Sequence, residues 1–139
     1  MAAGFMLRAT MLSVSAGLLT ACPERTAIWM VPGSTANHLE FEVGRRRGHP
    51  DPAAFRYLTM TACHGATKGF LWSVSQDASR RDVRGVSRVR FPKTPPGYGH
   101  YGPTGPLLAG CYEASVNGSG RTRVEVQSDG SVVESSVDS

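Results

Sequence analysis

The sequence lacks an apolar run long enough to cross a bilayer as a helix. The apolar stretch near its start, Met11–Leu19, has nine residues, whereas a membrane-spanning helix needs about 20. The net charge is only +4 at pH 7 in 139 residues, which argues against a dedicated nucleic-acid binder. The hydrophobic fraction of 40% argues equally against a disordered chain. We therefore expect one folded domain.

Motifs of common catalytic and metal sites are also missing. The sequence contains no H-E-x-x-H, G-x-S-x-G, S-x-x-K or Walker A pattern, and no C-x-x-C pair. Cys63 stands next to His64, but neighbouring side chains on a strand point to opposite faces, so the pair does not predict a nucleophile. We therefore expect a protein that is not an enzyme and that uses no cofactor or metal. A metal site built from His49, Asp51 and a remote histidine is the minor alternative.

The chain does carry the features of a bacterial export signal. Residues 1–10 have one positive charge, Arg8, and no acid, and the apolar run follows directly. The next residues, Leu19-Thr20-Ala21-Cys22, resemble a lipobox. This resemblance implies a bacterial lipoprotein in which Cys22 is the first mature residue and carries a diacylglycerol. Two or three acyl chains then give a stable membrane anchor. A plain secretory signal or a signal anchor is the alternative.

The residues after Cys22 bear on the choice of membrane and on the distance to it. In enteric lipoproteins an Asp in the next position retains the protein in the inner membrane. Here that residue is Pro23, which favours the outer membrane in a cell that has one. Six residues, CPERTA, form the whole tether and reach at most about 20 Å. We therefore expect four parts: a cleaved lipoprotein signal peptide over 1–21, a membrane tether over 22–27, a β-sandwich domain over 28–135 and a polar tail over 136–139.

Short runs of alternating residues, separated by turn residues, predict an all-β domain. In His38–Val43 apolar residues alternate with polar ones, which is the pattern of a half-buried strand. Glycine-containing turns at 117–120 and 128–130 divide the last third into a three-stranded antiparallel meander, and only 75–85 offers a short helix. The expected strands are Ile28–Val31, His38–Val43, Phe55–Cys63, Phe70–Val74, Val86–Phe91, Cys111–Val116, Thr122–Val126 and Ser131–Val133. About seven or eight such strands favour a single antiparallel β-sandwich, with a small β-barrel as the alternative.

One short pattern resembles a known class of sandwich. Leu107, Gly110 and Tyr112 precede an alternating strand and match the Leu-x-x-Gly-x-Tyr pattern of immunoglobulin-like and fibronectin-type domains. The resemblance covers residues 107–116 and implies a corner at which the Tyr112 hydroxyl bonds back to the main chain. The antibody pattern has its cysteine two residues after the tyrosine, whereas Cys111 precedes it. The resemblance therefore does not extend to the antibody inter-sheet disulfide.

Three cysteines are an odd number for an exported protein. If Cys22 is lipidated, Cys63 and Cys111 remain. Export places both in an oxidising compartment, where thiols normally pair. We therefore expect a Cys63–Cys111 disulfide.

Arginine supplies most of the positive charge. The chain after Ala21 has 12 arginines and only two lysines, and guanidinium groups pair well with phosphate and carboxylate oxygens. The clustered arginines are therefore candidate contacts for anionic lipid or envelope polysaccharide; they are Arg45, Arg46, Arg47, Arg88 and Arg90. Solvated arginine-rich loops are the simpler interpretation.

The segment 92–106 is the most unusual stretch, because nine of its fifteen residues are glycine or proline. Such a composition argues against a regular helix or a central strand and predicts a long loop. Tyr98, His100 and Tyr101 are its candidate binding residues, and a crossover with its tyrosines folded inward is the alternative.

The sequence thus favours a lipid-anchored, non-catalytic binding module of the bacterial cell envelope. Its expected partners are the membrane, an envelope protein or an anionic lipid or polysaccharide, and not nucleic acid. The alternative is a structural or assembly role as an accessory subunit of an envelope complex, which an exposed apolar patch would favour.

Overall fold

The computed structural model describes residues 25–63, 70–77, 79, 85–102 and 106–135. The predicted signal peptide with its lipobox, Cys22, His64, the polar tail and most of the possible helix at 75–85 lie outside these residues. No helix among the residues described is long and apolar enough to cross a membrane.

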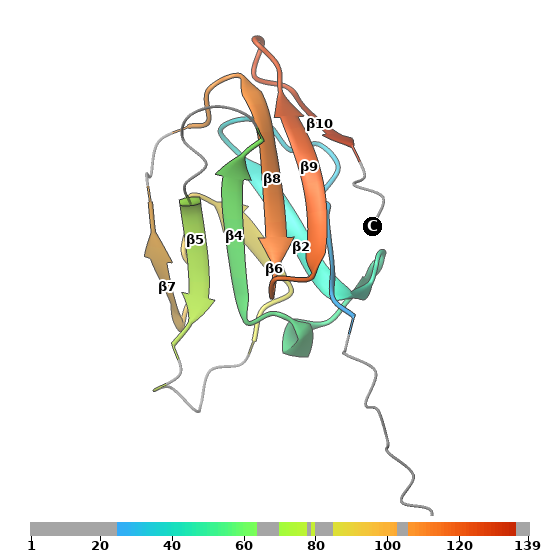
Figure 1. The fold of residues 1–139 in the computed structure, drawn as a ribbon, viewed down its shortest axis with the longest axis vertical. Coiled ribbons are helices and arrows are strands. Elements are labelled where there is room, and N and C mark those ends of the chain that lie inside the picture. Colours follow the sequence, from blue (N-terminus) through green and yellow to red (C-terminus); the bar gives the residue numbers. More distant parts are fainter. Residues whose placement is uncertain (1–24, 64–69, 78, 80–84, 103–105, 136–139) are drawn as a thin grey trace, which may run out of the picture.

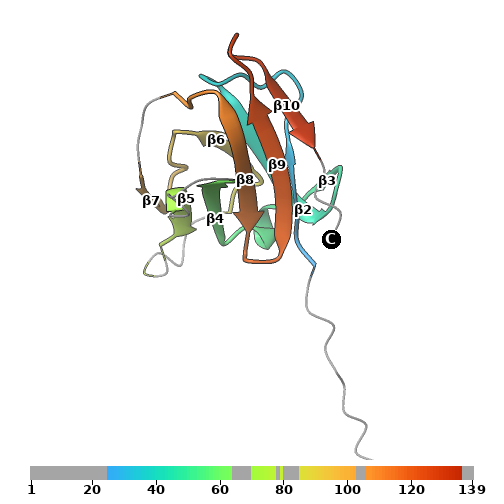
Figure 2. The same ribbon diagram turned by 45° about the horizontal axis from the view of Figure 1, so that its top comes forward.

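Two antiparallel sheets pack face to face (Figures 1 and 2). The small sheet contains β1 (Ala27–Met30), β2 (Leu39–Arg46), β3 (His49–Pro50) and β6 (Arg88–Phe91). The large sheet has the order β10 (Val132–Ser135), β9 (Gly120–Val126), β8 (Gly110–Val116), β4 (Tyr57–Ala62), β5 (Phe70–Gln76) and β7 (Tyr98–Tyr101). A single 3₁₀ turn, η1 (Pro52–Ala54), precedes β4. The predicted antiparallel β-sandwich is confirmed, and the barrel alternative is wrong because the two sheets do not close on each other.

The core forms because alternate residues of each strand point between the sheets. Leu39, Phe41 and Val43 of β2 are completely buried, and they face Trp72 and other residues of the large sheet. One continuous cluster holds nearly all the buried apolar side chains of both sheets; Trp29 of β1 is buried outside it. The alternation read from the sequence therefore identifies the inward face of β2 correctly.

The last third of the chain folds into the predicted meander, in which β9 pairs with both β8 and β10. The β8–β9 turn uses Asn117 and Gly118 at positive φ, 51° and 73°, as tight hairpin turns require. At the start of β8, the Tyr112 hydroxyl donates to the Leu108 carbonyl over 2.7 Å. This is the main-chain hydrogen bond that the Leu-x-x-Gly-x-Tyr pattern implies.

The predicted Cys63–Cys111 disulfide is also present, with a Cα–Cα distance of 5.4 Å. It joins the end of β4 to the start of β8, which are neighbours within the large sheet. The bridge therefore fastens one end of a single sheet and does not connect the two sheets.

Glu134 of β10 connects the two sheets at one edge of the sandwich. Its carboxylate accepts hydrogen bonds from the Met30 backbone N–H over 2.7 Å and from the Thr122 hydroxyl over 2.6 Å, and it pairs with Arg47. Met30 is on β1, the edge strand of the small sheet. The Met30 backbone N–H, which lies at the edge of the small sheet, thus finds its hydrogen-bond acceptor in the large sheet.

Candidate anion-binding site

Arg88 and Arg90 lie on the outer face of the small sheet, directly opposite two carboxylates of β2. Arg88 Nη2 is 2.6 Å from Glu42 Oε1, and Arg90 Nη2 is 2.7 Å from Glu40 Oε1. Opposite charges in register across an antiparallel pair stabilise that pair. Both arginines therefore bind carboxylates of their own sheet.

Glu40 is the most enclosed carboxylate of this face, with 8% of its surface exposed. Burial alone would raise its pKa, but the hydrogen bond and charge of Arg90, a hydrogen bond with His38 and the charge of Arg88 outweigh burial. The pKa of Glu40 is therefore lower than its ordinary value, and the charged form is the one that the fold stabilises.

The arginines of the β2–β3 turn are also engaged within the chain. Arg45 Nε donates to Asp51 Oδ2 over 2.9 Å, Arg46 Nη2 donates to His49 Nε2 over 2.7 Å, and Arg47 pairs with Glu134. A guanidinium that already holds a carboxylate has to release it before binding another anion. Four of the five arginines singled out in the sequence already hold a carboxylate, and the fifth, Arg46, contacts His49. All five are therefore weaker candidates for anion binding than their clustering in the sequence suggested.

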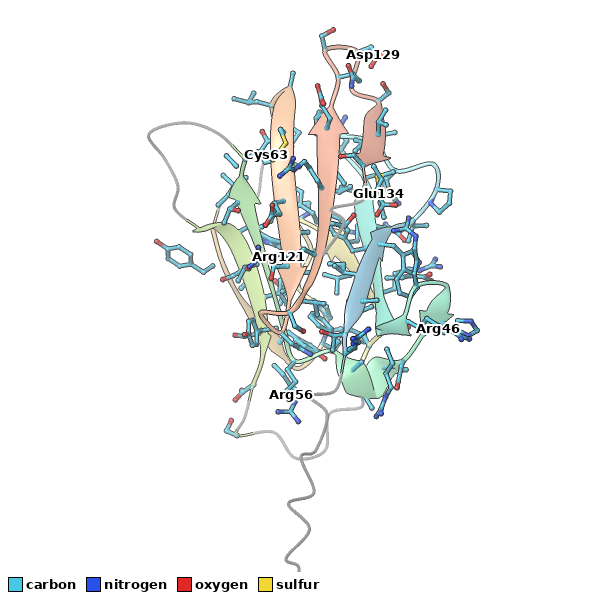
Figure 3. All side chains as sticks on the ribbon, turned by 45° about the vertical axis from the view of Figure 1, so that its right-hand side comes forward. Arg46, Arg56, Cys63, Arg121, Asp129 and Glu134 are labelled. Carbon is cyan, nitrogen blue, oxygen red and sulfur yellow. A yellow bond between two sulfur atoms is a disulfide. The ribbon has the colours of Figure 1, made fainter. Side chains whose placement is uncertain are left out.

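Two other arginines, Arg25 and Arg56, line a hollow of about 350 Å³ together with Arg45. Within the residues that the structure describes, neither Arg25 nor Arg56 has an ion-pair partner. The remaining lining residues are Thr26, Ala53, Ala54, Tyr57, Asn117 and Ser119. We call this feature the arginine hollow. It opens at the end of the sandwich where β1 begins, and Arg56 is visible at that end in Figure 3.

Asn117 builds one wall of the arginine hollow. Its side-chain oxygen accepts from the backbone N–H groups of Arg56 and Tyr57 over 3.0 and 3.1 Å, and its amide donates to the Ala54 carbonyl over 2.5 Å. The β8–β9 turn is thereby fixed against η1 and the start of β4. This arrangement holds the Arg56 backbone in place while its side chain stays exposed.

No known protein family, curated protein or solved structure matches the chain. The arginine hollow therefore has to be interpreted from its own geometry.

Two smaller hollows have the opposite character. One, of about 280 Å³, is lined by Thr61, Ala62, Cys63 and Glu113. The other, of about 290 Å³, is lined by Ser75, Gln76, Asp77, Gly97, Tyr98 and Gly99. Each has an acid and no cation among these lining residues, so of the three hollows only the arginine hollow is suited to an anion.

The predicted binding loop at 92–106 is partly wrong. Tyr98–Tyr101 forms the edge strand β7, which pairs with β5. Tyr98 is buried, stacks on Phe55 with ring centroids 4.9 Å apart, and donates its hydroxyl to the Phe55 carbonyl over 3.3 Å. Its burial raises the pKa of the Tyr98 hydroxyl. Tyr98 is therefore a core residue, whereas Tyr101 (70% exposed) and His100 remain on the surface.

The side chains of His49 and Asp51 both make contacts within the β2–β3 turn and η1. Asp51 accepts from the Ala53 backbone N–H over 3.0 Å and holds Arg45, while His49 contacts Arg46. No group of three or more metal-ligating side chains occurs in the described parts of the chain.

Arg25 and Arg56 were missed because each is an isolated arginine in the sequence. The available signal is positional: Arg25 precedes β1 and Arg56 directly precedes β4. Both strands run antiparallel to neighbours that end near the β2–β3 and β8–β9 turns. Their first residues therefore meet at one end of the sandwich, which only the strand pairing reveals.

Proposed function

We propose that the protein is a lipid-anchored, non-catalytic binding module of the bacterial cell envelope, attached through Cys22. The observation that carries this proposal is the lipobox-like Leu19–Cys22 followed almost at once by a folded domain. β1 begins five residues after Cys22, so the domain is held within about 20 Å of its anchor. Pro23 favours the outer membrane as the location.

The connectivity of the strands supports the resemblance to immunoglobulin-like domains. β2 pairs with β6 in one sheet, and β8 lies between β4 and β9 in the other. Strands B and E, and strands C, F and G, have this arrangement in immunoglobulin-like sandwiches. Such sandwiches serve many unrelated functions, so the likeness supports a binding scaffold and names no ligand.

The alternative function is that of an accessory subunit in an envelope complex. It is favoured by β7, an edge strand of the large sheet, because an unpaired strand edge is a ready docking site for another chain. Tyr101 on this strand and Leu108 after it are 70% and 80% exposed.

Lipid attachment is tested by expressing the full chain in a Gram-negative bacterium with a labelled fatty acid. We expect label in the protein, an intact mass that begins at Cys22 and includes a diacylglycerol, and no label in Cys22→Ser. An unlabelled wild-type protein, or a mature N-terminus at another residue, would contradict the proposal. Crosslinking in the native membrane then separates the two roles, since crosslinks to one protein concentrated at 98–108 would favour the accessory subunit.

A further inference from the structure

We infer that the arginine hollow binds the phosphate group of an anionic phospholipid in the membrane to which the protein is attached. The inference rests on the proposed lipid anchor for the choice of membrane. Its remaining support is the charge and geometry of the hollow itself.

Two of the three arginines that line the hollow have no carboxylate partner among the described residues. Arg25 and Arg56 have no ion-pair partner among the described residues, whereas Arg47, Arg88 and Arg90 each hold a carboxylate. No carboxylate belongs to the described lining of the hollow. A concave site lined by guanidinium groups and no acid favours an anion.

Hydroxyl groups add polar contacts to the same site. The Thr26 and Ser119 hydroxyls are hydrogen-bonded to each other over 2.7 Å, and Thr26 also contacts the Val116 carbonyl over 3.4 Å, so at most one of the two keeps a free proton. Tyr57, which also lines the hollow, is 41% exposed. A phosphate group has several acceptor oxygens, so it uses both guanidinium forks and hydroxyl donors. The Asn117 side chain is bonded to the backbone through its oxygen and through one amide hydrogen bond, so it fixes the shape of the hollow.

The position of the hollow close to the anchor favours a lipid phosphate over a phosphate in free solution. Arg25 is three residues after Cys22, which limits it to about 10 Å from the lipidated sulfur along the chain. A group held this close to a bilayer meets lipid headgroups at a high effective concentration. The hollow is thus placed where anionic headgroups are the nearest phosphates.

The test uses the chain from residue 22 with Cys22→Ser, which keeps the entire core because the buried core residues lie between Ile28 and Val126. Binding is measured to phosphatidylcholine vesicles with and without phosphatidylglycerol. The test variant is Arg25→Gln/Arg56→Gln. The matched control is Arg46→Gln/Arg121→Gln, which removes the same charge from two exposed arginines outside the hollow (Figure 3).

We expect binding that requires phosphatidylglycerol and falls roughly 30-fold in Arg25→Gln/Arg56→Gln, the loss for two cations at an anionic surface, but only about 3-fold or less in the control. Equal losses in the two double variants, or binding indifferent to phosphatidylglycerol, would overturn the inference. A parallel titration with inorganic phosphate distinguishes the sources: phosphate binding that depends on Arg25 and Arg56 without vesicle binding would overturn the lipid assignment. Because this chain carries no lipid, these results are independent of whether Cys22 is lipidated.

Discussion

Asn117 is the residue on which the shape of the arginine hollow depends most. A single side chain satisfies two backbone donors and one carbonyl, and its own backbone has a positive φ of 51°. The sequence predicted only the turn, because Asn-Gly signals a hairpin. The contacts of the Asn117 side chain with Ala54, Arg56 and Tyr57 span about 60 positions and have no local signal.

Replacing Asn117 by glycine separates these two roles. Glycine adopts the positive φ without strain, so Asn117→Gly removes only the side-chain hydrogen bonds and should lower the free energy of unfolding by about 2 kcal/mol. Urea denaturation measures this. The control is Asn37→Gly, at an exposed asparagine with no side-chain hydrogen bond among the described residues, which should cost less than about 0.5 kcal/mol. Equal costs for the two variants would show that the Asn117 contacts contribute nothing.

Glu40 makes the stability of the fold depend on pH. Its pKa is lowered in the folded protein, so its contribution is present above the pKa of the unfolded chain and is lost as the pH falls through the folded value. We expect Glu40→Gln to cost about 1 kcal/mol at neutral pH, since its arginine partners are partly exposed, and progressively less as the pH falls below the ordinary pKa of a glutamate. Denaturation across this range measures the difference. A stability difference between wild type and Glu40→Gln that does not change with pH would contradict the lowered pKa of Glu40. The control is Glu125→Gln, at an exposed carboxylate on β9.

At the scale of elements, the disulfide fastens β4 to β8 at the end opposite the arginine hollow. It closes a loop with a sequence separation of 48, for which chain entropy predicts about 4 kcal/mol of stabilisation. Cys63→Ala/Cys111→Ala should therefore unfold at a much lower urea concentration than the wild type. Reductant should lower the midpoint of the wild type to that of the variant and leave the variant unchanged. A wild-type midpoint that reductant does not move would contradict this prediction.

Strands with a clear alternation were predictable, and those without it were not. Leu39–Val43 and Val89–Phe91 were placed with the correct inward face because each strand has one buried side. β3 was missed because two residues cannot show a period, and β7 was missed because glycine and proline suggested a loop. An edge strand needs hydrogen bonds on one side only, so β7 tolerates a composition that would exclude a central strand.

The site was less predictable than the fold. Clustering in the sequence pointed to Arg45–Arg47, Arg88 and Arg90. The pairing of β2 with β6, however, places Arg88 opposite Glu42 and Arg90 opposite Glu40, so their positive charges are compensated within the sheet. Arg25 and Arg56, which have no ion-pair partner among the residues described, are far apart in the chain. The tertiary structure alone brings them to one hollow.

The whole molecule has two different ends. One end has the start of β1, η1 and the arginine hollow, and the other has the disulfide and the β9–β10 turn around Asp129 (Figure 3). A lipid at Cys22 would attach beside the first of these ends, because β1 begins there. We therefore expect the anchored protein to have one orientation, with the arginine hollow toward the bilayer and the disulfide away from it.

Quenching by spin-labelled lipids measures this orientation most directly. A fluorescent label is attached in the lipid-anchored protein either at Ala53→Cys, in η1, or at Ser128→Cys, in the β9–β10 turn; both positions are exposed. We expect strong quenching at position 53 and little at position 128. Equal quenching at the two positions, or stronger quenching at 128, would contradict this orientation.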